Sequence, residues 1–297
     1  MIPRTAVTWR SLLYVPANVP RFVAKAAGAG ADAVILDLED SVPPDRKLEA
    51  RAALAEAVPA IAAGGAEVLV RINQPLRLAV GDIEASMAAG AHGLLVTKCE
   101  GAQHLRLVAE AVASLEKTPG TTRLVPVAES ARALSRFDEM ATADPRVVAL
   151  LLGTEDLAAD IGCEPDEEVM LPLKHRMVVA AAAAGITALG LPGTVATFGD
   201  EAHVAAMARR ARRFGFGGAT CIHPKLVPIL NAAFTPDAEE VAAARRVVDG
   251  AADAAAQGRG SVTVDGRMVD EPVVQRAQRV LRRAEAAAQR DAARTPA

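Results

Sequence analysis

Apolar residues fall in eight short runs that are separated by longer stretches of helical periodicity. The runs are rich in Val, Leu and Ile and predict buried strands at residues 11–16, 33–40, 67–73, 93–98, 123–129, 147–156, 187–194 and 219–224. The stretches between them predict helices at residues 21–29, 46–62, 82–89, 103–115, 131–140, 167–184 and 201–214. This strict alternation indicates parallel strands joined by helical crossovers.

Eight strand–helix units are the number that closes a (β/α)8 TIM barrel, an α/β fold. An open, doubly wound sheet is the alternative, and it usually carries a glycine-rich turn after its first strand. Residues 14–22, with the sequence YVPANVPRF, contain no glycine. The pattern therefore favours the barrel.

The alternation stops after the eighth run. Residues 235–258 open with a Thr and Asp cap and an acidic first turn, which predict a helix. A short polar segment then leads into a last amphipathic helix. We expect a catalytic barrel over residues 1–233 and a C-terminal helical appendage over residues 234–297. The appendage is too small to fold alone, so it must pack on the barrel or on a neighbouring subunit.

Polar residues stand where several of the predicted strands end. Side chains two positions apart on a strand share a face, so an inward apolar residue predicts which polar residues point inward beyond it. On this basis we expect one end of the barrel to collect Asp37 and Glu39 after Ile35, Arg71 and Asn73 after Leu69, Lys98 after Leu94 and Val96, Glu129 after Val125 and Val127, Asp156 after Leu152 and Thr154, and His223 after Cys221.

A cluster with this many carboxylates is costly unless a cation compensates the charge. Oxygen ligands favour Mg2+ or Mn2+ over Zn2+, and few protein ligands leave room for water and substrate. Plainer roles stay open for single residues: a carboxylate at a strand end often caps a helix or forms a surface salt bridge. Arg71 could tie down a loop, and Lys98 could neutralise Glu39.

Composition narrows the class of partner. The formal net charge of −3 argues against nucleic acid or an anionic membrane as a partner. The apolar run at residues 178–185 is too short to span a bilayer, and residues 1–16 lack the long apolar core of a signal peptide. Three widely separated cysteines show neither disulfide nor metal-site spacing, which indicates a reducing, cytoplasmic environment.

Several segments together resemble one known family. They are RSLLYVPANVPRFVAKAAGAGADAVILDLEDSVPPDRKLEAR, VLVRIN, the Lys98 segment, VPVAES, LLLGTEDLAADIG, FGFGGATCIHPKLVPILNAAFTP and DGRMVDEPVV. In this order they are similar to the HpcH/HpaI aldolase and citrate lyase β-subunit family, over nearly the whole chain. The resemblance implies a (β/α)8 barrel that assembles as a homotrimer or a multiple of trimers. It also implies Mg2+ binding and the cleavage or formation of C–C bonds in hydroxyacyl thioesters.

The resemblance carries over to individual residues. Glu129 and Asp156 match the family's metal ligands, and Arg71 matches the arginine that holds the substrate carboxylate. Asp270 matches an aspartate of the family's acyl-CoA lyases. It would serve in acid–base catalysis from a neighbouring subunit, although it could instead cap the last helix.

Two segments depart from the family pattern. The sequence TKCE at residues 97–100 stands where Pro-Lys-Val-Glu is usual, and it keeps Lys98. The sequence TFGD at residues 197–200 lacks the first acid of Asp-Phe-x-Asp, which bears on the choice of substrate.

These residue types suit a reversible Claisen or aldol cleavage. A metal on Glu129 and Asp156 would act as Lewis acid and template for a 2-hydroxy acid unit, while Arg71 clamps its carboxylate in a bidentate manner. We place Arg71 and Glu129 among the substrate contacts. Arg21 and Lys25 either meet the CoA phosphates or form a solvated helix face. Acid–base and charge-balancing roles fall to Asp270, Arg71, Glu39, Asp37 and Lys98.

The sequence therefore predicts a Mg2+-dependent lyase of the citramalyl-CoA or malyl-CoA type, which releases a 2-oxo acid and a short acyl-CoA. Three alternatives stay open: a citrate lyase β subunit acting on a carrier-bound thioester, a free-acid aldolase, and a non-catalytic binding protein. The appendage with Asp270 disfavours the aldolase, and the retained Glu129, Asp156 and Arg71 disfavour the binding protein. The same residues are compatible with lyase, synthase or thioesterase chemistry and with several acyl chains.

Overall fold

The computed structural model describes residues 7–193 and 199–294. The chain divides into two compact units, Met1–Phe234 and Thr235–Ala297. The first unit contains all eight parallel strands, and the second contains two helices and a small hairpin. Each unit is described by itself below.

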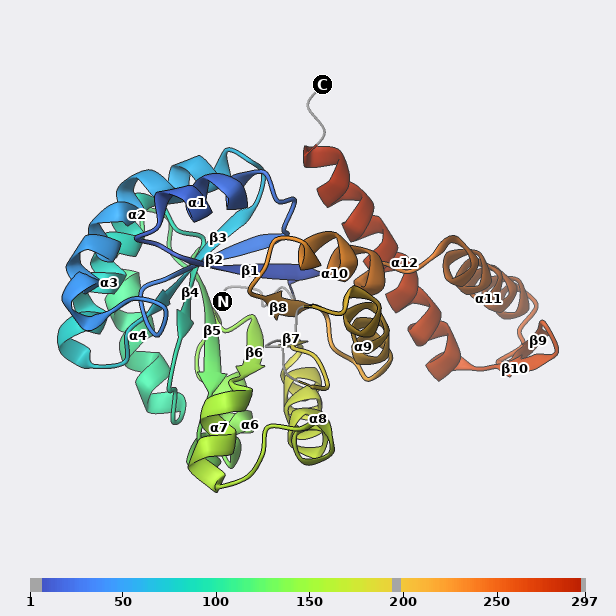
Figure 1. Ribbon diagram of the computed structural model, residues 1–297. Helices are drawn as coiled ribbons and strands as arrows, with labels where there is room; N and C mark the ends of the chain where they lie inside the picture. The colour runs from blue at the N-terminus through green and yellow to red at the C-terminus, as the bar shows by residue number, and fades with distance from the viewer. Residues whose placement is uncertain (1–6, 194–198, 295–297) are drawn as a thin grey trace. The chain divides into compact units, whose positions relative to one another are not determined.

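The first unit is a barrel of eight parallel strands (Figure 1). From the first to the seventh, each strand pairs with the next along the chain, and the eighth pairs with the first. Between the seventh and eighth strands the hydrogen bonds Gly190 N–Gly218 O and Gly217 N–Ala188 O, both 2.9 Å, bring the edges together. The strands are β1 (Ser11–Pro16), β2 (Ala33–Asp37), β3 (Glu67–Ile72), β4 (Gly93–Val96), β5 (Arg123–Ala128), β6 (Ala149–Leu152), β7 (Thr187–Leu189) and β8 (Ala219–Cys221). The predicted (β/α)8 barrel is confirmed.

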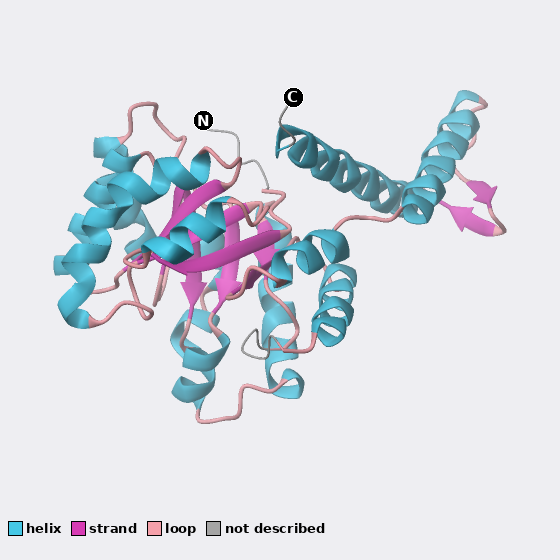
Figure 2. Ribbon diagram, turned by 45° about the horizontal axis from the view of Figure 1, so that its top comes forward, coloured by secondary structure: helices cyan, strands magenta, loops and turns pink. Residues whose placement is uncertain are grey.

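Helices cover the outside of the strands (Figure 2). They are α1 (Pro20–Ala27), α2 (Lys47–Ala62) after the short 3-10 helix η1 (Pro44–Arg46), α3 (Leu76–Ala89), α4 (Ala102–Leu115), α5 (Ala131–Leu134), α6 (Phe137–Ala141), α7 (Thr154–Ile161), α8 (Glu167–Ala184), α9 (Glu201–Arg213) and α10 (Leu226–Phe234). The helix predicted at residues 131–140 is two short helices. The helices α7 and α10 were not predicted, and α7 begins inside the run that was expected to be the sixth strand.

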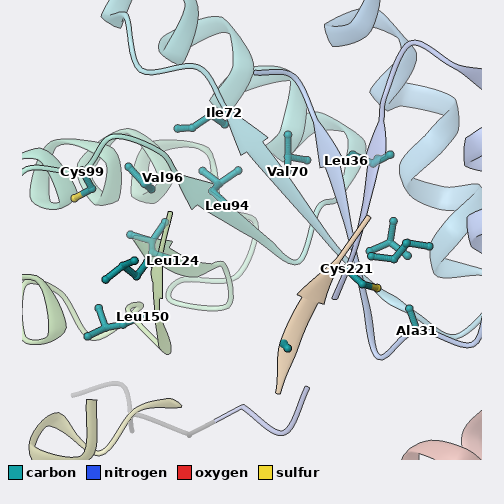
Figure 3. Packing of buried hydrophobic residues seen from close by; sticks show 14 of the residues in the cluster. Ala31, Leu36, Val70, Ile72, Leu94, Val96, Cys99, Leu124, Leu150 and Cys221 are labelled. Atoms are coloured by element: carbon teal, nitrogen blue, oxygen red, sulfur yellow. The ribbon is translucent and has the colours of Figure 1, made fainter. Parts of the chain in front are cut away.

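Two apolar layers hold the barrel together. Leu12, Ile35 and Leu69 belong to the cluster inside the ring of strands, and Leu36 and Val70 belong to the larger cluster that includes the surrounding helices. Figure 3 shows part of that larger cluster, with Leu36 and Val70 on neighbouring strands. Each fully buried aliphatic side chain contributes about 1.5–3 kcal/mol. Successive residues of a strand therefore belong alternately to the inner cluster and to the cluster beneath the helices.

The faces expected for three strands need correction. Leu94 and Val96 of β4, Leu152 of β6 and Cys221 of β8 belong to the outer cluster, whereas Leu95 and Leu151 belong to the inner one. The inward faces expected for β2, β3 and β5 are correct, since Ile35, Leu69, Val125 and Val127 lie in the inner cluster.

The amino end of the barrel is sealed. The Trp9 side chain is fully buried there as part of the inner cluster. The guanidinium of Arg10 donates from Nε and Nη2 to the two carboxylate oxygens of Asp32, both at 2.9 Å, and Asp32 is fully buried. A buried ion pair is stable only with such full pairing. Access to the barrel is therefore from the carboxyl end of the strands.

The second unit consists of two helices with a small two-stranded β-hairpin between them. Helix α11 (Ala238–Ala256) starts with a capping box in which Asp237 and Glu240 bond each other's backbone N–H groups. The antiparallel strands β9 (Val262–Val264) and β10 (Arg267–Val269) follow, and α12 (Glu271–Arg294) packs against α11. The predicted C-terminal helices are present, but the hairpin was not predicted. Within residues 7–193 and 199–294, no helix combines the length and apolarity that crossing a bilayer requires.

Candidate active site

A cavity of about 590 Å³ opens at the carboxyl end of the barrel strands. Its walls come from strand ends and the segments that follow them, among them Pro16, Asp37, Gly153, Gly190 and Ile222. This is the end of a TIM barrel at which catalytic groups collect.

Asp37 and Arg71 form a bidentate pair on the cavity wall. They lie opposite each other in the register of β2 and β3, with Arg71 Nε 2.7 Å from Asp37 Oδ1 and Nη2 2.6 Å from Oδ2. Asp37 also accepts bonds from the Glu39 and Ser41 backbone N–H groups and from the Ser41 hydroxyl. Burial opposes the charge of Asp37, but these partners outweigh it and hold its pKa below the usual value. Asp37 therefore orients Arg71.

The remaining terminal nitrogen of Arg71, Nη1, contacts two further carboxylates, those of Glu39 and Asp40. Nη1 lies 3.1 Å from Glu39 Oε2 and 3.1 Å from Asp40 Oδ2. The guanidinium also lies over the Tyr14 ring, 5.1 Å from its centroid. Burial disfavours the cation, but Asp37 and the other acids keep the pKa of Arg71 above its usual value. The guanidinium is thus fixed on several sides.

Lys98 contacts the acids from the segment that follows β4. The strand β4 ends at Val96, and Lys98 has a φ of 47°, in the left-handed region that non-glycine residues rarely adopt. Its ammonium contacts Glu39 Oε1 and lies 3.6 Å from Asp40 Oδ1 and 3.9 Å from Asp156 Oδ2. Strained backbone of this kind gathers at functional sites.

Glu129 and Asp156 lie on either side of this lysine. Glu129 follows β5, is 7% exposed, and accepts from Lys98 N at 2.6 Å through Oε2. Asp156 lies in the first turn of α7, because β6 ends at Leu152; the expectation that a strand carries it is wrong. Burial raises the pKa of Glu129 to about 7, and the charges of Asp156 and Glu39 add to this effect.

Gly153 makes room for Glu129. A Cβ atom on Gly153 would stand 2.5 Å from Glu129 Cγ and 2.9 Å from its Oε1. Such a distance is a clash that would force the carboxylate to move. The glycine is therefore part of what positions Glu129.

Negative charge exceeds positive charge in this cluster. Asp40 joins the carboxylates that the sequence predicted, and Arg71 and Lys98 are the cations that contact them. Within the described ranges, no group of three His, Cys, Asp or Glu side chains is arranged as a preformed set of metal ligands. Mg2+ needs none, since it is typically held by one or two carboxylates and keeps several waters. Glu129 and Asp156 could supply those two carboxylates.

Of the other residues that the sequence predicted for the site, some line the cavity and some do not. Lys25 on α1 and His223 after β8 line the cavity, whereas Arg21 does not and lies over the Phe22 ring, 4.9 Å from its centroid. Asp270 belongs to the second unit, where its Oδ1 accepts from Val273 N at 3.4 Å at the start of α12. The cap interpretation of Asp270 therefore has a contact in its favour.

The segment TFGD was expected to bear on substrate choice. Its first two residues, Thr197 and Phe198, lie outside the described residues. Asp200 is described, and its carboxylate accepts from His203 N at 2.9 Å as the cap of α9.

Two groups in the cavity wall were not singled out from the sequence. Tyr14, the single tyrosine of the chain, follows Leu12 on the inward face of β1, so alternation could have found it. Lys174 lies inside α8, and its ammonium donates to the carbonyls of Leu191, Pro192 and Gly193 at 2.9, 3.3 and 2.9 Å. Burial lowers the pKa of Lys174 to about 8. Nothing in the sequence indicates this contact.

Comparison with known proteins identifies the class to which this barrel belongs. Residues 10–224 match the family HpcH/HpaI aldolase/citrate lyase. The chain belongs to this family, so the resemblance seen in the sequence is confirmed. Members of the family include carbon–carbon lyases, which confirms the expectation of an enzyme.

Individual relatives cover nearly the whole chain. A (3S)-malyl-CoA thioesterase of Cereibacter sphaeroides is 34% identical over 283 residues, which are 94% of this chain and 96% of that protein. Citrate lyase subunit beta of Leuconostoc mesenteroides is 32% identical over 284 residues, 93% of each chain. The crystal structure of CitE from Mycobacterium tuberculosis in complex with magnesium, acetoacetate and coenzyme A has a TM-score of 0.75 and 32% identity. It covers 95% of this chain and 99% of that one.

The environment of Tyr14 yields a first prediction. Burial and the charges of Asp37, Glu129 and Glu39 raise the pKa of Tyr14 above its usual 10.0, against the opposing effect of Arg71. The folded protein should therefore show no tyrosinate absorbance near pH 10, and the signal should appear only as the chain unfolds in alkali. The unfolded chain loses this proton first, so stability should fall as the pH rises above 10.

Because the chain has one tyrosine, the absorbance reports Tyr14 alone. The urea-unfolded protein serves as the control and should titrate near pH 10. A reversible titration near pH 10 with the circular dichroism of the folded state intact would contradict the prediction.

Proposed function

We propose that the protein is a Mg2+-dependent lyase that cleaves a C–C bond of a hydroxyacyl-CoA thioester of the citramalyl-CoA or malyl-CoA type. The products are a 2-oxo acid and a short acyl-CoA. The observation that carries the proposal is the fixed guanidinium of Arg71 in the same cavity as the carboxylates of Glu129 and Asp156. A guanidinium beside two carboxylates suits a substrate whose carboxylate binds Arg71 and whose neighbouring oxygen can bind a metal.

Arg71 binds the substrate carboxylate. Asp37 occupies the Nε and Nη2 donors on one edge, so the substrate must use the terminal-nitrogen edge, where Glu39 and Asp40 lie in the free protein. Asp40 is exposed and can turn into solvent when the carboxylate arrives. A planar guanidinium fixed in this way recognises a carboxylate better than a lysine would.

Glu129 and Asp156 hold the metal. The CitE structure was determined in complex with magnesium, which supports this assignment. When bound, Mg2+ supplies Lewis acidity and a template for the oxygens of the 2-hydroxy acid unit. Lys98 keeps Glu129 in place through its backbone N–H and Glu39 in place through its ammonium.

Proton transfer completes the reaction. Cleavage needs a base for the substrate hydroxyl and an acid for the thioester enolate. We assign the acid–base step to Asp270. Glu39 and Lys98 balance the charge in the cavity. Burial and Asp40 raise the pKa of Glu39 above the usual carboxyl value, against the opposing effects of Lys98 and Arg71.

The CoA portion lies toward α1 in this proposal. Lys25 is exposed and lines the cavity, and Arg21 is exposed one helical turn earlier. Both cations can meet CoA phosphates. The coenzyme A in the CitE complex supports a thioester as the substrate class.

Assembly and location follow from the same proposal. We infer a homotrimer or a multiple of trimers, in which Asp270 of one subunit completes the cavity of the next. A cytoplasmic location fits the CoA substrate and the three free cysteines.

Incubation with a substrate panel tests the function. Purified protein with Mg2+ is offered malyl-CoA, citramalyl-CoA and citryl thioesters, and the products are identified by mass spectrometry. A 2-oxo acid together with a shorter acyl-CoA is the expected result. Free CoA with the intact hydroxy acid would favour a thioesterase, as in the Cereibacter relative, and an absence of any product would overturn the proposal.

The position of Gly153 gives a prediction for metal binding. Gly153→Ala places a Cβ atom against Glu129 and displaces its carboxylate. The Mg2+ concentration for half-maximal activity should rise about tenfold, the loss expected for one weakened charged contact. Gly28→Ala is the matched control, because a Cβ atom there meets nothing within 4 Å and the φ of −98° is ordinary. An unchanged Mg2+ requirement in Gly153→Ala would contradict the assignment.

Mixed oligomers test the role of Asp270. Glu129→Ala and Asp270→Ala should each lose about 10² to 10⁴ in kcat, as expected for loss of a metal ligand or a general acid. When the two inactive variants are mixed and allowed to exchange subunits, some sites regain both residues and activity should return. Exchange confirmed by mass spectrometry without any recovery would show that Asp270 does not act in the neighbouring subunit.

A further inference from the structure

Tyr14 presents an unpaired hydroxyl to the cavity. The residue lines the cavity from β1 and is packed against the apolar cluster inside the barrel. Within residues 7–193 and 199–294 its hydroxyl makes no hydrogen bond to the protein, and the charges of Arg71 and three acids of the site act on it. Tyr14 is only partly buried, so its hydroxyl is open to the cavity, where a bound ligand can become its hydrogen-bond partner.

The ring of Tyr14 is fixed from both sides. Apolar side chains inside the barrel support one side, and the Arg71 guanidinium lies over the ring at 5.1 Å from the centroid. Phenylalanine would give the same packing and a similar cation–π contact. The hydroxyl is therefore not required for this arrangement, and its presence needs another explanation.

The charges around Tyr14 decide what its hydroxyl can do. Asp37, Glu39 and Glu129 are acids near it, and a phenolate among them would be repelled. The hydroxyl therefore keeps its proton and can act as a neutral donor. A neutral donor beside a guanidinium suits an anionic oxygen, since the two groups can address one carboxylate.

We propose that the Tyr14 hydroxyl is a specificity-determining contact that donates a hydrogen bond to the carboxylate of the 2-oxo acid unit held by Arg71. This inference rests on the proposed function for the identity of the ligand. Arg71 supplies the positive charge that attracts the carboxylate, and Tyr14 supplies a hydrogen bond to it from a different side. Together they select a small carboxylate that reaches the floor of the cavity, while the CoA portion remains outside this contact.

Tyr14→Phe removes only the hydroxyl, so it tests the contact directly. Binding of pyruvate and of glyoxylate is measured by calorimetry in the presence of Mg2+, and the KM of the thioester is measured in parallel. We expect both acids to bind about tenfold more weakly to the variant, with a similar rise in KM. The melting temperature and the affinity for free CoA should stay at the wild-type values, because packing and the CoA contacts are unchanged.

Thr121→Val is the control for loss of a hydroxyl. Thr121 is exposed in the loop between α4 and β5, and its hydroxyl bonds only the Thr118 carbonyl in the described structure. This variant should bind both acids as the wild type does. Equal affinity of wild type and Tyr14→Phe for the 2-oxo acids, or a loss that extends equally to free CoA, would overturn the proposal.

The same measurements separate this inference from the proposed function. Weaker acid binding in Tyr14→Phe supports the contact even if the wild type cleaves no thioester, a result that would overturn the lyase alone. Conversely, an active wild type with unchanged acid binding and KM in Tyr14→Phe overturns the contact alone. A wild type that binds neither acid with Mg2+ present overturns the contact.

Discussion

The bidentate pair between Asp37 and Arg71 is the interaction on which the rest of the site depends. Each residue comes from the end of a neighbouring strand, so the register of β2 and β3 sets their meeting. Without Asp37 the partly buried guanidinium would lose its bidentate partner, and a buried Asp37 without Arg71 would tend to take up a proton. Their pairing leaves the edge of the guanidinium that carries its terminal nitrogens, which the proposed function assigns to a substrate carboxylate.

The carboxylates next to this pair carry excess negative charge, which a bound cation would stabilise. Glu129 is buried, and its pKa of about 7 reflects a carboxylate that is expensive to ionise where it stands. The neighbouring acids Asp156 and Glu39 add to that cost, and Lys98 offsets only part of it. Glu129 and Asp156 would hold a divalent ion in the proposed function, and its charge would favour the ionised form of Glu129. The fold that fixes Arg71 thus also places Glu129 and Asp156, the carboxylates that the proposed function assigns to the metal.

Strand alternation predicted the site where the strands continue up to it. Asp37, Arg71 and Glu129 follow inward residues directly, and they lie where the sequence places them. The rule failed where polar residues beyond the strand ends were used to choose the inward face, so the faces expected for β4, β6 and β8 were wrong. Lys98 reaches the acids through a positive φ, and Asp156 comes from a helix that starts after Leu152. Period-two reasoning holds only within a strand, so contacts made by turns, such as that of Lys174 with the loop after β7, could not be read from spacing.

Titration of the metal-free protein with Mg2+ by calorimetry tests the central claim most directly. Wild type should bind about one ion per chain, and Glu129→Gln should bind it at least tenfold more weakly, because one of two carboxylate ligands is lost. Glu110→Gln, an exposed acid on the outside of α4, is the control and should bind as wild type does. No saturable binding by the wild type, or equal binding by Glu129→Gln, would contradict the account.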